Sequence, residues 1–208
     1  MSSARTKLVV GLGNPGREYV GTRHNIGFAV LEELAAKQNG SFKRKLRFNA
    51  EVAEIAADDA GKLVLVKPQT FMNRSGAAVV AMLSWLKVAP EEMLVVVDDA
   101  DLPLGQLRLR ECGGSGGHNG LRSIIESLGG CETFPRLRVG IGRRGSAGED
   151  ITGHVLGRFA SAERAAATDA VADAAAAVAC CVKEGLTTAM NRFNRKAPPK
   201  AGQEGEVF

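Results

Sequence analysis

Three histidines are the side chains best suited to general-base chemistry near neutral pH, and they differ in their surroundings. His24 follows the first predicted strand and lies near two side-chain amides, Asn14 and Asn25. His118 lies in a glycine-rich loop, and His154 lies in a glycine-bounded segment without polar neighbours. We therefore expect His24 to be the base and His154 to be a surface or packing residue.

Polar side chains also follow other predicted strands. Asp98 comes after an apolar strand, Asn119 ends the glycine-rich loop, and a further strand is followed by Phe71, Met72 and Asn73. The set offers a carboxylate to orient a base and amides to bind a peptide or an oxyanion. It contains no Ser or Cys with an obvious activating partner. This pattern favours direct attack by water on a labile bond.

A glycine motif at Gly11, Gly13 and Gly16 matches the dinucleotide-binding fingerprint. That fingerprint requires a helix that opens at once, but Pro15 and polar residues follow, and the next predicted helix begins only near Asn25. No strand that ends in an acid follows at the required distance. We do not expect a nicotinamide cofactor.

A second motif, Gly113-x-Ser115-x-Gly117, matches the nucleophile elbow of serine hydrolases, with Asp150 and His154 in the right chain order. Five of the eight residues at 113–120 are glycine, so such a match arises almost automatically. The aspartate and the histidine are also too close in sequence to come from two strand-end loops. A serine hydrolase is not favoured.

Three acids after one strand, Asp98, Asp99 and Asp101, are typical of metal sites in nucleases and NTPases. The GxxxxGK[ST] loop of an NTPase is absent from the sequence. A metal-dependent phosphodiesterase remains an open alternative, which activity in EDTA would test.

The elements that must position these groups alternate between strands and helices. Apolar, β-branched runs predict strands at 7–12, 62–67, 93–97 and 137–141. Weaker signals predict two more strands, at 48–56 and 106–110. Helical spacing follows near 25–37, 74–86, 119–128, 161–184 and 187–193. We predict an α/β fold, a single three-layer domain whose mixed, mainly parallel twisted sheet is flanked by helices. The catalytic domain spans 1–195, and 196–208 is expected to be a disordered basic and polar tail.

Composition supports a cytoplasmic protein in a reducing compartment. The four cysteines form no metal-binding spacing, no apolar run reaches the roughly 20 residues of a membrane helix, and Met1–Thr6 shows no signal pattern. The net charge of +4 is concentrated in basic runs at 43–47, 136–144 and 185–203. Such runs suit a phosphate backbone, but charge alone does not distinguish this from a solvated surface.

Five successive segments resemble the signatures of bacterial peptidyl-tRNA hydrolase: VVGLGNPGREYVGTRHNIGF, KPQTFMNRSG, DDADLPLGQLRLR, GGSGGHNGLRSII and FPRLRVGIGR. With LTTAMNRFN near the end, the resemblance covers roughly residues 7–195. It implies a monomeric, cytoplasmic ester hydrolase that acts on peptidyl-tRNA, needs no cofactor or metal, and has no membrane or obligate protein partner.

The resemblance also implies roles for individual residues. His24 would activate water, Asp98 would orient it, and Asn14 would select substrates with a blocked α-amine. Asn73 and Asn119 would bind the peptide and ester region, although Asn73 could also cap the following helix. The cleft would be walled by Tyr19, Phe71 and Met72. The acceptor stem and its 5′-phosphate would be contacted by Arg108, Arg110 and Arg138.

The sequence departs from the family pattern at a few of these places. Two of the three arginine positions often carry Lys, and a bidentate Arg contact could differ in geometry. Val97 replaces a residue that is often polar, and His154 replaces a commonly apolar one. One rival remains, because a plant organellar relative of this family serves as a group II intron splicing factor. Only Met1–Thr6 precedes the first strand, which favours the enzyme.

Overall fold

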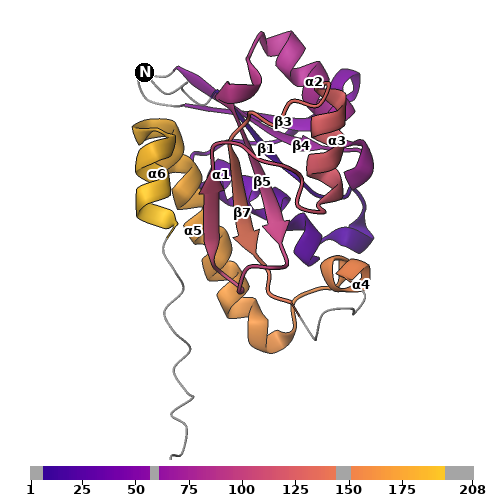
Figure 1. Cartoon of the computed structure of the whole chain (residues 1–208), viewed down its shortest axis with the longest axis vertical. Helices are drawn as coiled ribbons and strands as arrows, with labels where there is room; N and C mark the ends of the chain where they lie inside the picture. The colour runs from indigo at the N-terminus through magenta and orange to yellow at the C-terminus, as the bar shows by residue number, and fades with distance from the viewer. Residues whose placement is uncertain (1–6, 57–60, 144–150, 195–208) are drawn as a thin grey trace, which may run out of the picture.

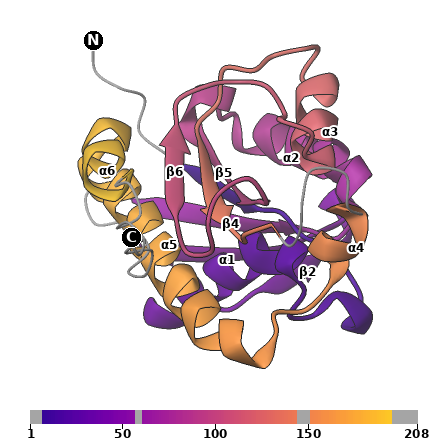
Figure 2. The same ribbon diagram turned by 60° about the horizontal axis from the view of Figure 1, so that its bottom comes forward.

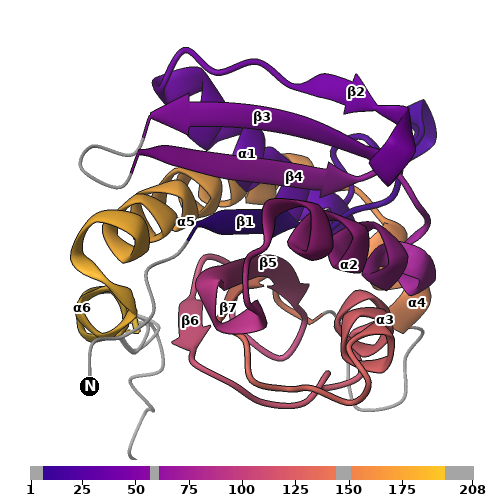
Figure 3. The same cartoon turned by 90° about the horizontal axis from the view of Figure 1, so that it is seen from above.

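A seven-stranded mixed sheet forms the centre of the protein in a computed structural model that describes residues 7–56, 61–143 and 151–194. The strand order is β2-β3-β4-β1-β5-β7-β6, which can be followed across Figure 3. The strands are β1 (Leu8–Gly11), β2 (Lys43–Lys45), β3 (Ala50–Ala56), β4 (Lys62–Pro68), β5 (Met93–Asp99), β6 (Leu107–Arg110) and β7 (Arg136–Gly140).

The four central strands, β4, β1, β5 and β7, run parallel, while β3 and β6 pair antiparallel with their neighbours. The expected mixed, mainly parallel sheet is confirmed, as are its six predicted strands. Strand β2 was not predicted, because its residues Lys43, Arg44 and Lys45 are all exposed and carry no apolar alternation.

Helices cover both faces of the sheet, as Figure 1 shows. On one face lie α1 (Ile26–Lys37), α5 (Arg164–Glu184) and α6 (Leu186–Phe193), and on the other lie α2 (Ser75–Leu86) and α3 (Asn119–Ser127). Each face of the sheet packs against its helices in a separate hydrophobic core, and successive residues of β5 alternate between the two cores. Val96 belongs to the core with α1 and α5, and Val95 and Val97 belong to the core with α2 and α3. The three-layer prediction is therefore confirmed.

A short helix, α4 (Ile151–Leu156), was not expected, since six residues with one inner glycine give no helical periodicity. It lies at the end of the sheet toward which the arrowheads of β5 and β7 point in Figure 1, and Figure 2 shows it from a second direction. The proposed boundary between the domain and a tail at 196–208 lies outside the described residues and stays a prediction.

Gly11 permits a close approach between β1 and α1. A Cβ atom at Gly11 would lie 2.3 Å from the carbonyl oxygen of Gly27 in α1. The chain then forms two short 3-10 turns, Arg17–Tyr19 and Arg23–Asn25, before α1 begins. This path differs from the immediate strand-to-helix turn of a dinucleotide site. The first glycine of the motif serves packing here.

One helix bears on the expectation that no apolar run reaches the length of a membrane span. Ser161–Glu184, 24 residues, is long and apolar enough to cross a membrane by length and composition. Half of its most apolar window is nevertheless buried inside the protein, where Ala174 and Val178 of α5 belong to the same core as Leu31 of α1. A core helix meets the same criteria, because burial requires the same apolar side chains.

Candidate active site

Two histidines converge on one carboxylate where β5 ends. His24, in the 3-10 turn before α1, places Nδ1 2.8 Å from Oδ1 of Asp98. His118, at the start of α3, places Nε2 3.0 Å from the same oxygen. All three side chains are buried, and the two imidazole centroids are 5.0 Å apart. The cluster therefore joins residues from three separate elements.

The hydrogen bonds determine the proton positions on both rings. Nδ1 of His118 accepts from the backbone N–H groups of Gly120 and Leu121, at 3.1 and 3.2 Å, and so caps α3. The His118 proton must then lie on Nε2, which donates to Asp98. His24 in turn donates its Nδ1 proton to Asp98. This tautomer leaves Nε2 of His24 with a lone pair that can accept a proton.

The Asp98 carboxyl remains ionised in this cluster. Burial alone would raise its pKa, but the electrostatic attraction to His118 and His24 and the hydrogen bonds that they donate outweigh burial and hold the pKa of Asp98 well below its usual range. A carboxylate that stays charged can orient the His24 ring and stabilise the imidazolium that forms when His24 takes a proton.

The same three residues are the one group within the described ranges whose donor atoms, all within 4.8 Å, could surround a metal ion. Coordination needs a lone pair on each nitrogen. In His118 the atom that faces the cluster carries the proton, and a proton moved to Nδ1 would meet two backbone N–H groups. As folded, this donor set fits a hydrogen-bonded triad better than a metal.

The three acids suspected of metal binding also do not converge. Asp99 pairs with Arg138, with Oδ2 3.2 Å from Nε, and Asp101 pairs with Arg143 at 3.0 Å. Only Asp98 contacts the histidines. The geometry thus gives no support to a phosphodiesterase metal site at these positions.

A cleft of about 340 Å³ opens beside the two histidines. Most of the predicted site residues line it, namely Asn14, His24, Phe71, Met72, Asn73, Asp98, Asn119 and Arg138. Side chains of α4 form another part of the wall, among them Ile151 and Val155. Tyr19 is not among the lining residues. Its ring packs edge-on against the exposed Phe71 ring, with the centroids 6.5 Å apart.

Asn14 is held rigidly at the cleft. Its side-chain Oδ1 accepts a hydrogen bond from the backbone N–H of Met72 at 2.8 Å. Its backbone N–H donates to Oδ1 of Asn25 and its carbonyl accepts from Nδ2 of Asn25, both at 2.9 Å. Because Oδ1 is already engaged, the donor Nδ2 is the group that Asn14 can offer to a ligand.

The other two amides differ in their local roles. Asn73 lies in the 3-10 turn Met72–Arg74, and the cap position of α2 is Arg74, without a side-chain cap. The alternative that Asn73 caps α2 is therefore wrong. Asn119 is the first residue of α3, and its Oδ1 accepts from Arg122 at 3.3 Å.

The arginines of β6 and β7 form two facing pairs, Arg108 with Arg138 and Arg110 with Arg136. Arg136 is buried and structural, since its guanidinium donates to the carbonyls of Gly113, Phe134 and Glu132. Arg110 is exposed, whereas Arg108 is half-buried. Of the three predicted tRNA contacts, only Arg138 lines the cleft.

His118 is the site residue that sequence reasoning missed. Its position directly before a predicted helix, next to Asn119, was the available signal, because a polar residue there caps the helix. His154 is half-buried, as a packing residue would be, but the expectation that it lacks polar neighbours is wrong, since its Nε2 lies 2.7 Å from the carbonyl oxygen of Gly142. Ser115 lies in the loop before α3, and Asp150 lies outside the described residues.

Comparison with known proteins points to one family. The family model described as peptidyl-tRNA hydrolase matches residues 8–201. A peptidyl-tRNA hydrolase from Synechococcus sp. (strain JA-3-3Ab) is 53% identical over 188 residues, which cover 90% of this chain and 82% of the relative. One from Syntrophomonas wolfei is 49% identical, covering 90% of this chain and 100% of the relative.

A solved structure agrees with the sequence matches. The Arg119Gln mutant of peptidyl-tRNA hydrolase from Acinetobacter baumannii superposes with a TM-score of 0.85 at 39% identity, covering 93% of this chain and 97% of that chain. These matches favour the hydrolase over the splicing-factor alternative.

Proposed function

The chain belongs to the peptidyl-tRNA hydrolase family and is an enzyme, and from this premise we propose that the cleft beside His24 is its active site. There it hydrolyses the ester bond between a peptide, or an N-blocked amino acid, and the 3′-terminal ribose of tRNA. Hydrolysis frees the tRNA of prematurely released peptidyl-tRNA for reuse. The hydrogen bond from His24 to the buried, ionised Asp98 is the observation that carries this proposal.

In the proposed reaction, Nε2 of His24 takes a proton from a water molecule as the water oxygen attacks the ester carbonyl. The imidazolium that forms is stabilised by Asp98, whose charge is already present. Collapse of the tetrahedral intermediate breaks the ester C–O bond, and the proton returns from His24 to the ribose oxygen that leaves. His118 keeps Asp98 in place throughout.

The remaining cleft residues bind the peptide side of the substrate. Nδ2 of Asn14 donates to a carbonyl of the N-blocked peptide, which supports selection against a free α-amine. Asn73 and Asn119 bind the peptide and ester region, and Phe71 and Met72 form the apolar wall. Tyr19 supports this wall from behind Phe71 and does not line the cleft itself.

The basic residues bind the tRNA body. Arg138 at the cleft and Arg108 beside it on β6 contact phosphates of the acceptor stem, with Arg110 farther along the strand. The enzyme acts as a cytoplasmic monomer without a metal, a cofactor or an obligate protein partner.

One assay tests this proposal directly. The protein is incubated with N-acetyl-aminoacyl-tRNA in the presence of EDTA, and release of N-acetyl-amino acid is measured for the wild type and for His24→Ala. We expect rapid release by the wild type and a loss of about 10²–10⁴-fold in the variant. Intact substrate at high wild-type concentration would refute the activity, and dependence on a metal would refute the metal-free mechanism. A variant with more than about a tenth of wild-type activity would show that another group is the base.

A further inference from the structure

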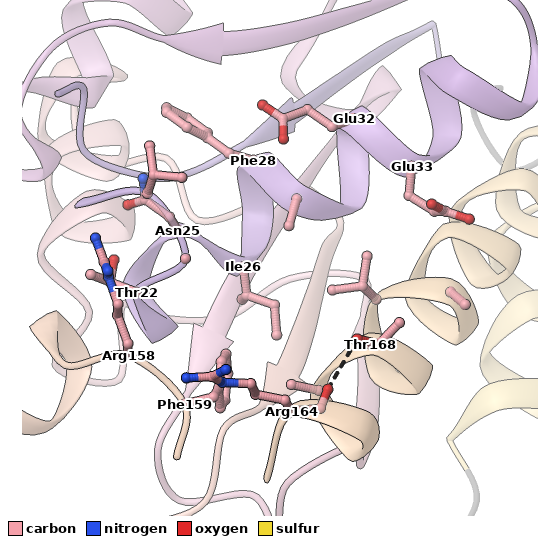
Figure 4. A pocket seen from close by; sticks show the side chains of 16 residues that line it. Thr22, Asn25, Ile26, Phe28, Glu32, Glu33, Arg158, Phe159, Arg164 and Thr168 are labelled. Atoms are coloured by element: carbon pink, nitrogen blue, oxygen red, sulfur yellow. Dashed lines mark hydrogen bonds between the residues drawn. The ribbon is translucent and has the colours of Figure 1, made fainter. Parts of the chain in front are cut away.

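The short segment that carries His24 separates two cavities. His24 lines the active-site cleft, whereas Thr22, Asn25 and Ile26 line a larger cavity of about 770 Å³ between α1 and α5. Figure 4 shows Ile26 facing Phe159 and Thr168 across this second cavity. The side chains of this segment are almost fully buried, and Asn25 ties it to the backbone of Asn14 by two hydrogen bonds. On its other side the segment borders the second cavity, where tight packing does not hold it.

Arg23, which directly precedes His24, holds the segment on the side of the second cavity. Its side chain is only 4% exposed. Nη1 donates to the carbonyl oxygen of Arg158 and Nη2 pairs with Oε2 of Glu163, both at 2.7 Å. The guanidinium carbon also lies 4.9 Å from the ring centroid of Phe159. One buried side chain thus binds a segment more than 130 residues away in the sequence.

Backbone contacts strengthen the same junction. The N–H of Arg23 donates to the carbonyl of Gly157 at 3.0 Å, and Thr22 forms a β-bridge with Arg158. Gly157 directly follows α4, whose Val155 and Leu156 line the active-site cleft. The Arg23 junction therefore connects the base, one wall of the cleft and the start of α5.

We propose that Arg23 is a positioning residue for the hydrolytic reaction: its fork-shaped contact with the Arg158 carbonyl and Glu163 holds Nε2 of His24 at its working distance from the ester. This inference rests on the proposed role of His24 as the base. Arginine suits the position because its planar guanidinium donates in two directions at once, which a lysine ammonium at the same place does not reproduce.

The size of the effect follows from the chemistry of positioning. A displacement of about 1 Å in a catalytic group can cost on the order of 10²-fold in rate. Arg23 is not among the residues that line the cleft, so its loss should leave substrate binding nearly unchanged. We therefore expect Arg23→Gln to lower kcat by about 10- to 100-fold, with KM within about twofold of the wild-type value. The kcat of Arg23→Lys should lie between those of the wild type and Arg23→Gln.

Arg158→Gln is the matched control. It removes the same charge from the same junction, but Arg23 contacts only the backbone carbonyl of Arg158, and that side chain is exposed. We expect wild-type kinetics for this control. Glu163→Gln, which can still accept a hydrogen bond from Arg23, should lower kcat less than Arg23→Gln does.

A spectroscopic measurement separates positioning from loss of stability. With ¹⁵N-labelled histidine, the ring N–H protons of His24 and His118 that donate to Asp98 report on each hydrogen bond. In Arg23→Gln and Arg23→Lys, the His24 signal should shift or broaden more than the His118 signal, which senses the change only through the shared Asp98 oxygen. A merely destabilised protein would show both signals unchanged at temperatures where it is folded.

Unchanged kcat in both Arg23 variants, a loss confined to KM, or an equal loss in Arg158→Gln would overturn the inference. The Arg23→Lys variant keeps the test decisive if Arg23→Gln does not fold. His24→Ala distinguishes the two proposals. An inactive His24→Ala beside fully active Arg23 variants refutes only the positioning role, whereas an active His24→Ala refutes the proposed base itself.

Discussion

His118 donates a 3.0 Å hydrogen bond from Nε2 to Oδ1 of Asp98, the same carboxylate oxygen that His24 contacts. The bond is possible only in one tautomer, because Nδ1 of His118 caps helix α3. The helix cap and the catalytic carboxylate are therefore connected through a single ring. This arrangement lets substitutions at His118 separate structural from kinetic effects.

His118→Asn should preserve the helix cap and remove the hydrogen bond to Asp98. Asparagine is a good N-cap residue, but its shorter side chain cannot serve both partners. We expect a kcat lowered by about tenfold, by analogy with other orienting contacts, and a thermal stability between those of the wild type and His118→Ala, because the helix cap is kept and the buried hydrogen bond to Asp98 is lost. His118→Ala should show the same kinetic loss and also unfold more easily, by about 1 kcal/mol. Normal kcat in both variants would show that His118 serves only the helix.

Asp98→Asn should lower kcat far more than it changes KM. The amide keeps the shape of the side chain and can still accept from both imidazoles, but it lacks the charge that stabilises a His24 imidazolium. Steady-state kinetics with N-acetyl-aminoacyl-tRNA measure both constants. If only KM rose, Asp98 would bind substrate and would not assist the base.

The low pKa of Asp98 also predicts how stability depends on pH. Because its folded pKa lies below the unfolded value of about 3.9, the stabilisation is complete above that value and is lost as pH falls through the folded pKa. Chemical denaturation of wild type and Asp98→Asn across about pH 7 to pH 3 checks this. Between about pH 4.5 and pH 3 the unfolded Asp98 takes up a proton while the folded one stays ionised, so the difference in their free energies of unfolding should shift against the wild type. A constant difference down to pH 3 would contradict the low pKa.

Asn14→Asp should impair binding at the peptide end of the substrate. One carboxylate oxygen can still accept from the Met72 N–H, but the donor Nδ2 is replaced by an oxygen that cannot donate. We expect a lower kcat/KM for N-acetyl-aminoacyl-tRNA, a weaker preference over free aminoacyl-tRNA, and unchanged affinity for deacylated tRNA. Unaltered selectivity would remove Asn14 from the peptide site.

Neutralising Arg108 or Arg110 should weaken binding about equally for different tRNAs. Removing one arginine–phosphate interaction should reduce the slope of log K against log salt by about one unit or somewhat less, through counterion release. Binding measured at several salt concentrations tests this, and a solvated surface predicts no change in slope.

Arg138→Gln should behave differently, because Arg138 also lines the cleft and pairs with Asp99. We expect it to reduce cleavage of a short N-blocked aminoacyl ester as well as tRNA affinity. Arg108→Gln serves as the control, with normal cleavage of that ester. Normal cleavage of the short ester by both variants would show that Arg138 takes no part in the reaction, although it lines the cleft.

Much of the fold and part of the site were predictable because their causes are local in the sequence. The apolar runs at 62–67 and 93–97 predict buried strands, and polar residues that follow parallel strands meet at one edge of a sheet. This rule placed Asn14 and Asp98 near each other without knowledge of any contact. The family motif that contains His24 lies in the loop after the first strand, so the same rule places His24 at this edge of the sheet.

Tertiary structure decided which polar groups touch. His24 is 74 residues from Asp98, and Arg23 is 140 residues from Glu163, so neither pair has a periodicity that a sequence could reveal. The four arginines of β6 and β7 look alike in sequence, yet Arg136 is buried among carbonyls while Arg110 is exposed. The sequence did not predict a role for His118, because the glycine-rich loop around it shows no periodic pattern. Only the packing of α3 into the core that it shares with β5 turns its ring toward Asp98, since a hydrogen bond depends on a few tenths of an ångström that chain order does not specify.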